Sequence, residues 1–289
     1  MKIKILIPIY NDWQSVFKLV DEINDLLIDP SFEISVILVN DASNHDRQDE
    51  DRKLENIHSI KILNMKINQG HSRCIATGLK YIYEKEDFDY VIPMDGDGED
   101  RPEEIKEFLN QIENSNNKPI VGERIKRSEN FIFKVCYQLH KLITLTFTGK
   151  SIKFGNYTCL PKTTVEKMIN EKATWSSFSG ALAKIAKDRA PIPSERGKRY
   201  FGPSKMSFKN LLIHSLSIVS VFKTNVLIRS IFFLIVYFFL IHQNITLITL
   251  IPVLLVFILL VSVILVSKRE NLEEFNNSLI NISNIDNLK

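Results

Sequence analysis

An uncharged stretch near the C-terminus constrains this chain most. Residues 230–267, 38 in all, contain no Asp, Glu, Lys or Arg. One helical crossing of a hydrocarbon layer about 30 Å thick needs about 20 residues. The stretch therefore predicts a hairpin of two membrane-spanning helices, with its turn at the polar residues 242–244. Pro252 falls inside the second predicted helix, where a bilayer tolerates proline with local adjustment.

Basic residues flank the uncharged stretch on both sides. They are Lys205, Lys209, Lys223, Arg229, Lys268 and Arg269. The predicted turn carries no charge, and basic flanks face the cytoplasm. We therefore expect a multi-pass protein of the cytoplasmic (inner) membrane, with both ends of the hairpin and the large N-terminal part inside the cell.

The segment before the hairpin, residues 205–225, has an apolar stripe beside basic residues. The stripe consists of Phe208, Leu211, Leu212, Leu216 and Val219. This pattern is typical of a helix that lies in the headgroup layer, and a core helix of the soluble part is the alternative. After the hairpin (226–267), residues 268–289 are polar and rich in Asn. They predict a loosely ordered cytosolic tail.

Composition excludes several classes of protein. The chain has 289 residues, is 45% hydrophobic and carries a formal charge of +3 without basic runs, which argues against nucleic acid as a partner. Its three cysteines are widely spaced without a C-x-x-C pair, so neither a disulfide framework nor a thiolate metal site is expected. The apolar N-terminus is broken by Pro8 and predicts a first strand rather than a signal peptide.

The N-terminal part predicts an α/β fold. Four short runs rich in β-branched residues, 3–9, 32–40, 59–65 and 90–94, are typical of buried strands. Apolar residues recur at helical spacing between several of them. Alternating strands and helices indicate a mostly parallel sheet covered on both faces. Ligands bind beyond the carboxyl ends of such strands, where Tyr10, Asp41 and Asp95 converge.

An acidic cluster, residues 95–100, follows the fourth predicted strand. A bend at Gly96 lets Asp95 and Asp97 reach the same space, and hard carboxylate oxygens suit Mg²⁺ or Mn²⁺ bridging to substrate phosphates. No dinucleotide fingerprint or P-loop occurs. A divalent ion beside a diphosphate neutralises charge on a departing nucleotide, so the cluster indicates a phosphate-linked donor.

Five blocks carry a resemblance to a known family. In chain order they are residues 7–12, 39–43, 68–70, 95–102 and 199–205. Together they resemble the inverting family 2 glycosyltransferases of GT-A fold, in particular the polyprenyl-phosphate (dolichol-phosphate mannose synthase-like) branch with two C-terminal transmembrane helices. The resemblance implies a nucleotide-diphospho-sugar transferase domain over residues 1–204, with a mostly parallel, Rossmann-like sheet.

The resemblance also implies an activity. A sugar would pass from a nucleotide-sugar to a polyprenyl phosphate at the cytoplasmic membrane face, with Mg²⁺ or Mn²⁺, to give a lipid-linked sugar for envelope or glycan assembly. A homo-oligomer is left open. Two alternatives remain: transfer to a hydroxyl of a lipid-linked glycan, and a catalytically inactive, transferase-like membrane subunit.

The matched positions acquire roles from the resemblance. Nucleotide contacts are implied for Pro8, Tyr10, Asp12, Val39, Asp41, Asp95, Gly96 and Arg124. The implied metal ligands are Asp95, Asp97 and Glu99. Catalytic roles are implied for Asp95, Asp97, Arg199 and Lys205, the last two as cations for the diphosphate and the acceptor phosphate. Structural alternatives exist, such as an exposed ion pair for Arg124 and headgroup binding for Arg199 and Lys205.

Two positions depart from the family pattern. Asp12 stands where relatives often have Glu, and Asn156 stands where many show the Asp of Gly-Asp-Phe. Asn156 cannot act as a general base, but a lipid phosphate is already an anionic nucleophile and needs none. His71 stays outside the predicted site, because a histidine at a helix start is more often simply exposed.

Overall fold

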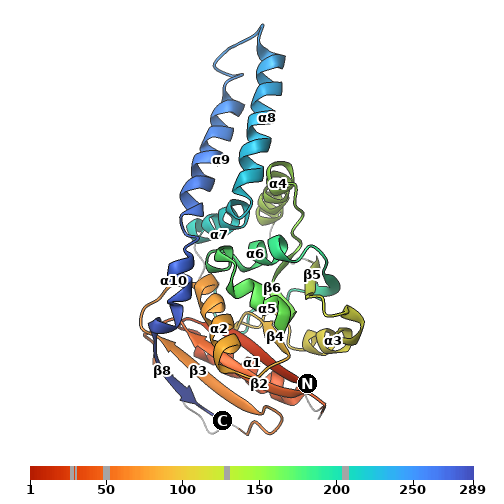
Figure 1. Cartoon of the computed structure of the whole chain (residues 1–289), viewed down its shortest axis with the longest axis vertical. Coiled ribbons are helices and arrows are strands. Elements are labelled where there is room, and N and C mark those ends of the chain that lie inside the picture. The colour runs from red at the N-terminus through yellow and green to blue at the C-terminus, as the bar shows by residue number, and fades with distance from the viewer. Residues whose placement is uncertain (27–28, 30, 48–52, 127–130, 204–207) are drawn as a thin grey trace. The chain divides into compact units, whose positions relative to one another are not determined.

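A computed structural model of the chain describes residues 1–26, 29, 31–47, 53–126, 131–203 and 208–289 (Figure 1). The chain divides into two compact units. The sheet unit consists of residues 1–128, 153–204 and 271–289, and the helical unit consists of residues 129–152 and 205–270. The predicted segment 1–204 thus contributes to both units.

The sheet unit is built on one eight-stranded mixed sheet in the order β7-β5-β6-β4-β1-β2-β3-β8. The strands are β1 (Lys2–Ile9), β2 (Glu33–Asn40), β3 (Ser59–Met65), β4 (Tyr90–Pro93), β5 (Ile120–Lys126), β6 (Phe154–Pro161), β7 (Ala190–Glu195) and β8 (Ile282–Asn287). Strands β1 to β4 are mutually parallel, and β5 is parallel to β7. Strands β6 and β8 run antiparallel to their neighbours. The predicted α/β class and the four predicted strands are confirmed.

Helices cover both faces of the central strands. Ile3, Ile5 and Ile7 of β1 share one core with α1 (Trp13–Leu26) and with α3 (Glu104–Gln111). The alternate residue Leu6 is buried outside that core, on the opposite face. Helix α2 (His71–Lys85) packs on β1 and β2, and α5 (Lys162–Ile169) packs on α2. Since β1 is buried on both faces, residues 5–9 are continuously apolar. Lys4 is also buried, and its ammonium group pairs with Glu86 at 3.3 Å.

The C-terminal segment is ordered, which corrects the expectation of a loose tail. It forms α10 (Leu272–Asn276), a 3₁₀ turn (Ser278–Asn281) and β8, which pairs with β3. Phe275 is fully buried and stacks on Trp175 with ring centroids 5.5 Å apart. The Glu274 carboxylate accepts a hydrogen bond from Trp175 Nε1 at 2.9 Å. The buried Phe275 ring and the backbone pairing of β8 with β3 thus order this segment despite its polar composition.

The helical unit contains α4 (Phe131–Thr148), α7 (Phe208–Ser220), α8 (Lys223–Ile241) and α9 (Ile251–Ser267). Helix α4 had no counterpart in the sequence analysis. Its last carbonyls, at Thr146 and Thr148, accept hydrogen bonds from Arg229 Nη1 at 3.0 Å and Asn225 Nδ2 at 3.1 Å. These donors satisfy helix-end carbonyls that would otherwise lack partners. They fix the end of α4 against the start of α8.

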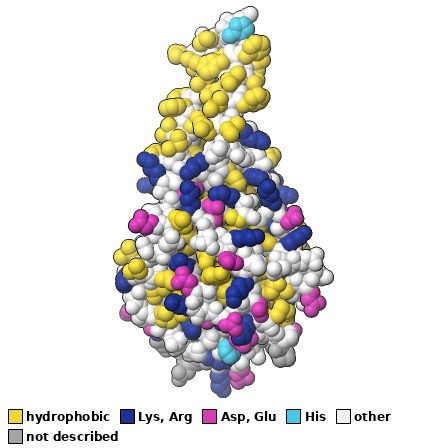
Figure 2. Space-filling model, in the orientation of Figure 1, with side chains coloured by type: hydrophobic (Ala, Val, Ile, Leu, Met, Phe, Trp, Pro, Cys, Tyr) yellow, Lys and Arg dark blue, Asp and Glu magenta, His cyan; other side chains and the backbone are white. Residues whose placement is uncertain are grey.

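Helices α8 and α9 match the predicted hairpin. Within the described residues these two helices are long and apolar enough to cross a membrane. Many of their apolar side chains are exposed, including Phe232, Phe239, Leu240, Leu255 and Phe257. On the face that Figure 2 shows, hydrophobic side chains dominate over both helices.

The connection between α8 and α9 is longer than expected, because it runs over residues 242–250. Pro252 lies inside the second helix, as predicted. Pro252 stands in the first turn of α9, where an N–H has no intrahelical acceptor and its absence costs little.

The anchor role of Phe275 is testable. Replacing Phe275 with Ala empties a fully buried aromatic site and should lower the free energy of unfolding by about 3–5 kcal/mol. Chemical denaturation of the detergent-solubilised protein measures this change. Leu272→Ala on the same helix is the control, because Leu272 is 41% exposed. Equal stability of the two variants would contradict the assignment.

Candidate active site

Three polar loops meet where the central parallel strands end. Ile9 of β1 pairs with Asn40 of β2, and Leu6 of β1 pairs with Pro93 of β4. Parallel strands end at a common edge, so the residues that follow β1, β2 and β4 lie together there. The sequence prediction that these three segments converge is confirmed.

The loops after β1 and β2 are bound to each other. Asn11 adopts a left-handed backbone conformation with φ 54°. Its side-chain Oδ1 accepts hydrogen bonds from the N–H groups of Asn44 and His45, at 2.9 and 3.1 Å. The Asn11 N–H donates to Ser43 Oγ at 2.9 Å. Beside this junction Tyr10 is 44% exposed.

Two of the apolar predicted nucleotide contacts lie inside the strands. Pro8 and Val39 are buried and face each other across the β1–β2 pair. Tyr10, which follows β1, is therefore the aromatic side chain that this edge offers to a ligand.

Asp41 holds the loop that leads into α2. It is 4% exposed, and its two carboxylate oxygens accept hydrogen bonds from the N–H groups of Gln69 and Gly70, at 2.7 and 2.8 Å. The Asp41 carbonyl accepts a third, from Asn68 Nδ2 at 3.1 Å. The structure therefore gives Asp41 a supporting contact beneath the start of α2.

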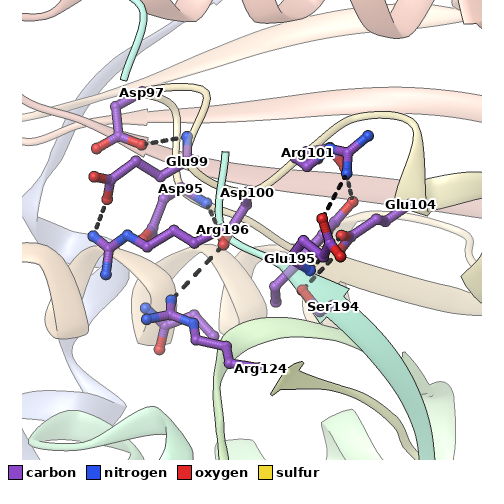
Figure 3. Close-up of polar contacts among 12 residues, drawn as sticks. Asp95, Asp97, Glu99, Asp100, Arg101, Glu104, Arg124, Ser194, Glu195 and Arg196 are labelled. Atoms are coloured by element: carbon purple, nitrogen blue, oxygen red, sulfur yellow. Dashed lines mark hydrogen bonds and ion pairs between the residues drawn. The ribbon is translucent and has the colours of Figure 1, made fainter. Parts of the chain in front are cut away.

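The acidic turn, residues 95–100, is folded by its own side chains (Figure 3). The N–H of Asp95 donates to Asp100 Oδ2 at 2.9 Å, and the N–H of Glu99 donates to Asp97 Oδ1 at 3.0 Å. Gly98 has φ +87°, and a Cβ there would lie 2.5 Å from the Tyr200 ring. A side chain is thus excluded at Gly98 both by conformation and by space.

Gly96 lies against the sheet unit's core. A Cβ at Gly96 would meet Val16 of α1 at 2.6 Å and Ile7 of β1 at 2.9 Å. The bend between Asp95 and Asp97 therefore requires glycine. Gly96 was predicted to contact the nucleotide; in the structure it lets the turn pack closely against α1 and β1.

His71 and Asn156 face the first carboxylate of the turn. His71 Nε2 lies 3.2 Å from Asp95 Oδ1 and 2.8 Å from Asn156 Nδ2. Burial alone would raise the pKa of Asp95, but the adjacent His71 holds that pKa well below its usual range. Burial opposes the charged imidazolium, yet Asp95, Asp100 and Asp97 together raise the pKa of His71. Asp95 and His71 thus favour each other's charged forms.

Asp100 lies beneath the turn and is 5% exposed. Burial, reinforced by the Asp95 carboxylate, raises the pKa of Asp100 to about 8. Arg124 Nη2 lies 4.0 Å from Asp100 Oδ1. Arg124, whose side chain is 23% exposed, thus lies beside a buried carboxyl group rather than in the exposed ion pair that the sequence analysis gave as its alternative.

Two arginines from a distant segment grip the other carboxylates of the turn. We call residues 196–201 the arginine clasp. Arg196 pairs with Glu99, and Arg199 Nη1 donates to Asp97 Oδ2 at 2.6 Å. Arg199 also pairs with Asp12 at the start of α1. The arginine clasp thus joins the acidic turn to the loop after β1.

Backbone and aromatic contacts hold the clasp in place. The N–H of Gly197 donates to the Glu99 carbonyl at 2.8 Å, and the N–H of Tyr200 donates to the Asp97 carbonyl at 2.9 Å. The Tyr200 hydroxyl bonds Glu22 of α1. Burial, reinforced by that hydrogen bond, raises the pKa of Tyr200. The Tyr200 hydroxyl therefore stays protonated and donates its hydrogen bond to the Glu22 carboxylate.

The donor set suits a divalent ion, although it is not gathered around one point. Asp95, Asp97 and Glu99 offer hard oxygens, and Asp95 Oδ1 is buried without a hydrogen bond of good geometry. Among the residues that the structure describes, no three His, Cys, Asp or Glu side chains form a group able to hold a metal ion. Arginines occupy the carboxylates of Asp97 and Glu99.

The structure brings together most of the predicted site. Asp12, Asp97 and Glu99 are connected through Arg199 and the turn backbone, and Asp95, in the same turn, bonds Asp100 and faces His71. Lys205 lies outside the described residues. His71, Asp100, Arg196 and Tyr200 contact these residues but were not predicted. The spacing of Arg196, Lys198 and Arg199 was the available signal for Arg196, and the helix start after Gly70 was the signal for His71.

The loops after β1, β2 and β4 lie within a region that matches a known family, whereas the arginine clasp lies beyond it. Residues 4–176, more than half of the chain, match the model described as Glycosyl transferase family 2. The chain belongs to glycosyl transferase family 2. That region includes the loop after β1, Asp41 and the whole acidic turn of this family member.

Solved structures of other transferases share the fold. One is S. aureus TarS, residues 1–349, in complex with UDP-GlcNAc, with 14% identity, a TM-score of 0.50, and 80% of this chain and 70% of that chain covered. Another is glucosyl-3-phosphoglycerate synthase from Mycobacterium tuberculosis in complex with Mn²⁺, uridine-diphosphate and phosphoglyceric acid, with 10% identity, a TM-score of 0.54 and 78% of each chain covered. The predicted GT-A-like fold of this family 2 member is thereby confirmed.

The supporting role of Asp41 is testable. Asp41→Asn keeps the shape but turns an amide N–H₂ toward a backbone donor, and should lower the free energy of unfolding by about 1–3 kcal/mol. Urea denaturation measures this change against Asp188→Asn, an exposed carboxylate on the same unit. If Asp41→Asn weakened UDP binding and left stability unchanged, a direct nucleotide contact would replace the supporting role.

Proposed function

We propose that this family 2 member is an inverting glycosyltransferase that moves a sugar from a nucleotide-sugar to a polyprenyl phosphate at the cytoplasmic membrane face. The observation that carries the proposal is the acidic turn at the carboxyl edge of the sheet. It occurs in a chain that also has two helices long and apolar enough to cross a membrane. A charged donor and a lipid-borne acceptor both suit this combination.

The donor side of the proposal rests on the loops at the sheet edge. Tyr10 offers an exposed ring to a nucleobase, with Pro8 and Val39 buried behind it. Asp12, which pairs with Arg199 beside this loop, would contact the ribose, and Arg199 would contact the diphosphate. The solved complexes of the two similar transferases contain UDP or a UDP-sugar, so UDP is the first probe to use.

Asp95, Asp97 and Glu99 would hold Mg²⁺ or Mn²⁺, the ions named in solved complexes of the similar M. tuberculosis synthase. The bound ion would supply positive charge beside the departing diphosphate. Arg199 and Arg124 add cationic groups on this chain, and Lys205 keeps its proposed role at the acceptor phosphate. Bidentate guanidinium groups suit phosphate oxygens.

The acceptor side rests on the chemistry of Asn156. Asn156 faces Asp95 and His71 at the position where many relatives carry a carboxylate. An amide cannot take a proton from a sugar hydroxyl, whereas a phosphate monoester is anionic at neutral pH. In the proposed reaction an acceptor phosphate oxygen forms a bond to the anomeric carbon. The bond from that carbon to the nucleoside diphosphate breaks, and the diphosphate leaves with the electron pair.

Parts of the chain before and after the α8–α9 segment belong to the same sheet unit. Residues up to 204 and residues 271–289 belong to one sheet unit, in which β8 pairs with β3. This arrangement supports a hairpin in which the two ends of the α8–α9 segment emerge on the same side of the bilayer. Basic residues at both ends favour the cytoplasm.

An organic-phase assay tests the reaction. Purified protein is given radiolabelled nucleotide-sugars with polyprenyl phosphate or with a lipid-linked glycan, and incorporation into lipid is measured. We expect transfer to polyprenyl phosphate, and a loss of at least about 100-fold in Asp97→Asn, since that carboxylate faces the developing charge. Glu103→Gln is the control, because Glu103 is exposed beside the turn. Transfer only to the glycan, or full activity of Asp97→Asn, would contradict the proposal.

Cysteine labelling tests the membrane arrangement. A cysteine at Gln243, in the α8–α9 connection, should react with an impermeant reagent from outside the cytoplasm, and a cysteine at Lys268 should react only from inside. The unsubstituted chain gives the background. Labelling of Gln243→Cys only from the cytoplasmic side would overturn the proposed orientation.

A further inference from the structure

The arginine clasp neutralises the carboxylates that a metal ion would need. Arg199 Nη1 lies 2.6 Å from Asp97 Oδ2, and Arg196 pairs with Glu99. These side chains are between 16% and 29% exposed. Charge pairs that are largely withdrawn from water are not easily exchanged for solvent. An ion that binds Asp97 and Glu99 must therefore compete with two guanidinium groups.

Exchange of the two arginines for one divalent ion leaves the net charge around Asp97 and Glu99 unchanged. Two guanidinium groups carry the same total charge as one divalent cation. If the ion takes their place, Asp97 and Glu99 keep their neutralisation. Arg196 then becomes available to an anion, and so does the part of the Arg199 guanidinium group that faced Asp97, while Arg199 keeps its pair with Asp12. A nucleoside diphosphate bound at the same edge is the anion that the proposed function supplies, and a guanidinium group matches phosphate oxygens in pairs.

The arginine side chains of the clasp can leave Asp97 and Glu99 without any break in the backbone hydrogen bonds that hold the clasp against the turn. The hydrogen bonds from Gly197 to the Glu99 carbonyl and from Tyr200 to the Asp97 carbonyl use main-chain atoms only. A Cβ at Gly197 would lie 2.5 Å from the Gly98 carbonyl oxygen, so glycine permits this close approach. The Tyr200 ring against Gly98 fixes the same register. Exchange therefore needs rotation of two side chains and no displacement of the segment.

We propose that Arg196 and Arg199 are exchangeable counter-ions of the acidic turn, which hold Asp97 and Glu99 until a divalent ion displaces them and then bind the donor diphosphate. This inference rests on the proposed function and assigns Arg196, which the sequence analysis did not single out, to the donor site. It also makes metal binding and nucleotide binding mutually supportive through named side chains.

The effect of arginine removal on Mn²⁺ affinity distinguishes an exchangeable counter-ion from a residue that only positions the carboxylates. If the arginines only positioned the carboxylates, their removal would leave Mn²⁺ binding unchanged or weaken it. If they compete with the ion, Arg196→Gln and Arg199→Gln should each bind Mn²⁺ more tightly without nucleotide. The expected gain is about threefold to tenfold, the range of one partly exposed charge pair. With Mn²⁺ saturating, both variants should bind UDP more weakly by at least about tenfold.

Mn²⁺ binding is measured by electron paramagnetic resonance on the full detergent-solubilised chain, and UDP binding by calorimetry. Arg101→Gln is the matched control. Arg101 borders the same turn but pairs with Glu103 and Glu195, at 3.5 and 3.8 Å. The substitution Arg101→Gln removes one positive charge near the turn, as the clasp variants do, but leaves the partners of Asp97 and Glu99 in place. Thermal unfolding of each variant verifies folding, and if one arginine variant does not fold, the other carries the test.

Tighter Mn²⁺ binding in the clasp variants, absent in Arg101→Gln, together with weaker UDP binding would support the proposal. Weaker or unchanged Mn²⁺ binding, or an equal gain in Arg101→Gln, would overturn it while leaving the proposed function in place. Failure of the wild-type chain to bind UDP with saturating Mn²⁺ would overturn the proposed function and this inference together.

Discussion

The crowding of carboxylates at one edge of the sheet is the constraint on which the site depends. Asp95, Asp97, Glu99 and Asp100 lie within six residues; Asp100 is buried and the other three are only partly exposed. Such a cluster is stable only if cations or protons compensate it. The chain supplies both: cationic partners for three carboxylates, and a raised pKa for the buried Asp100.

The compensating groups come from segments far apart in sequence. His71 arrives on α2, Arg124 on β5, and Arg196 and Arg199 on the segment after β7. Their meeting requires the whole mixed sheet, since β5, β6 and β7 extend the edge on one side of β4. The fold of the sheet unit therefore serves chiefly to bring positive charge to one acidic turn.

Features that depend on residues close together in the sequence could be predicted, and features that depend on residues far apart in the sequence could not. Strands β1 to β4 and the acidic turn are local patterns, and apolar runs with a D-x-D bend at Gly96 were enough to predict them, whereas β5, β6 and β7 were not predicted. The contacts of Arg196 and Asp41 depend on residues brought close by tertiary structure, which one sequence does not mark. The C-terminal strand was missed because its polar composition resembles a tail, while its order comes from Phe275 and from pairing with β3.

The central claim is that the acidic turn accepts a divalent ion and a nucleoside diphosphate together. Calorimetric titration of UDP with and without Mn²⁺, and of Mn²⁺ with and without UDP, tests this claim most directly. Linkage requires the two enhancements to be equal. The account predicts that each ligand tightens the other by at least about tenfold, a coupling typical of linked sites. Independent binding of the two ligands, or binding of neither, would contradict it.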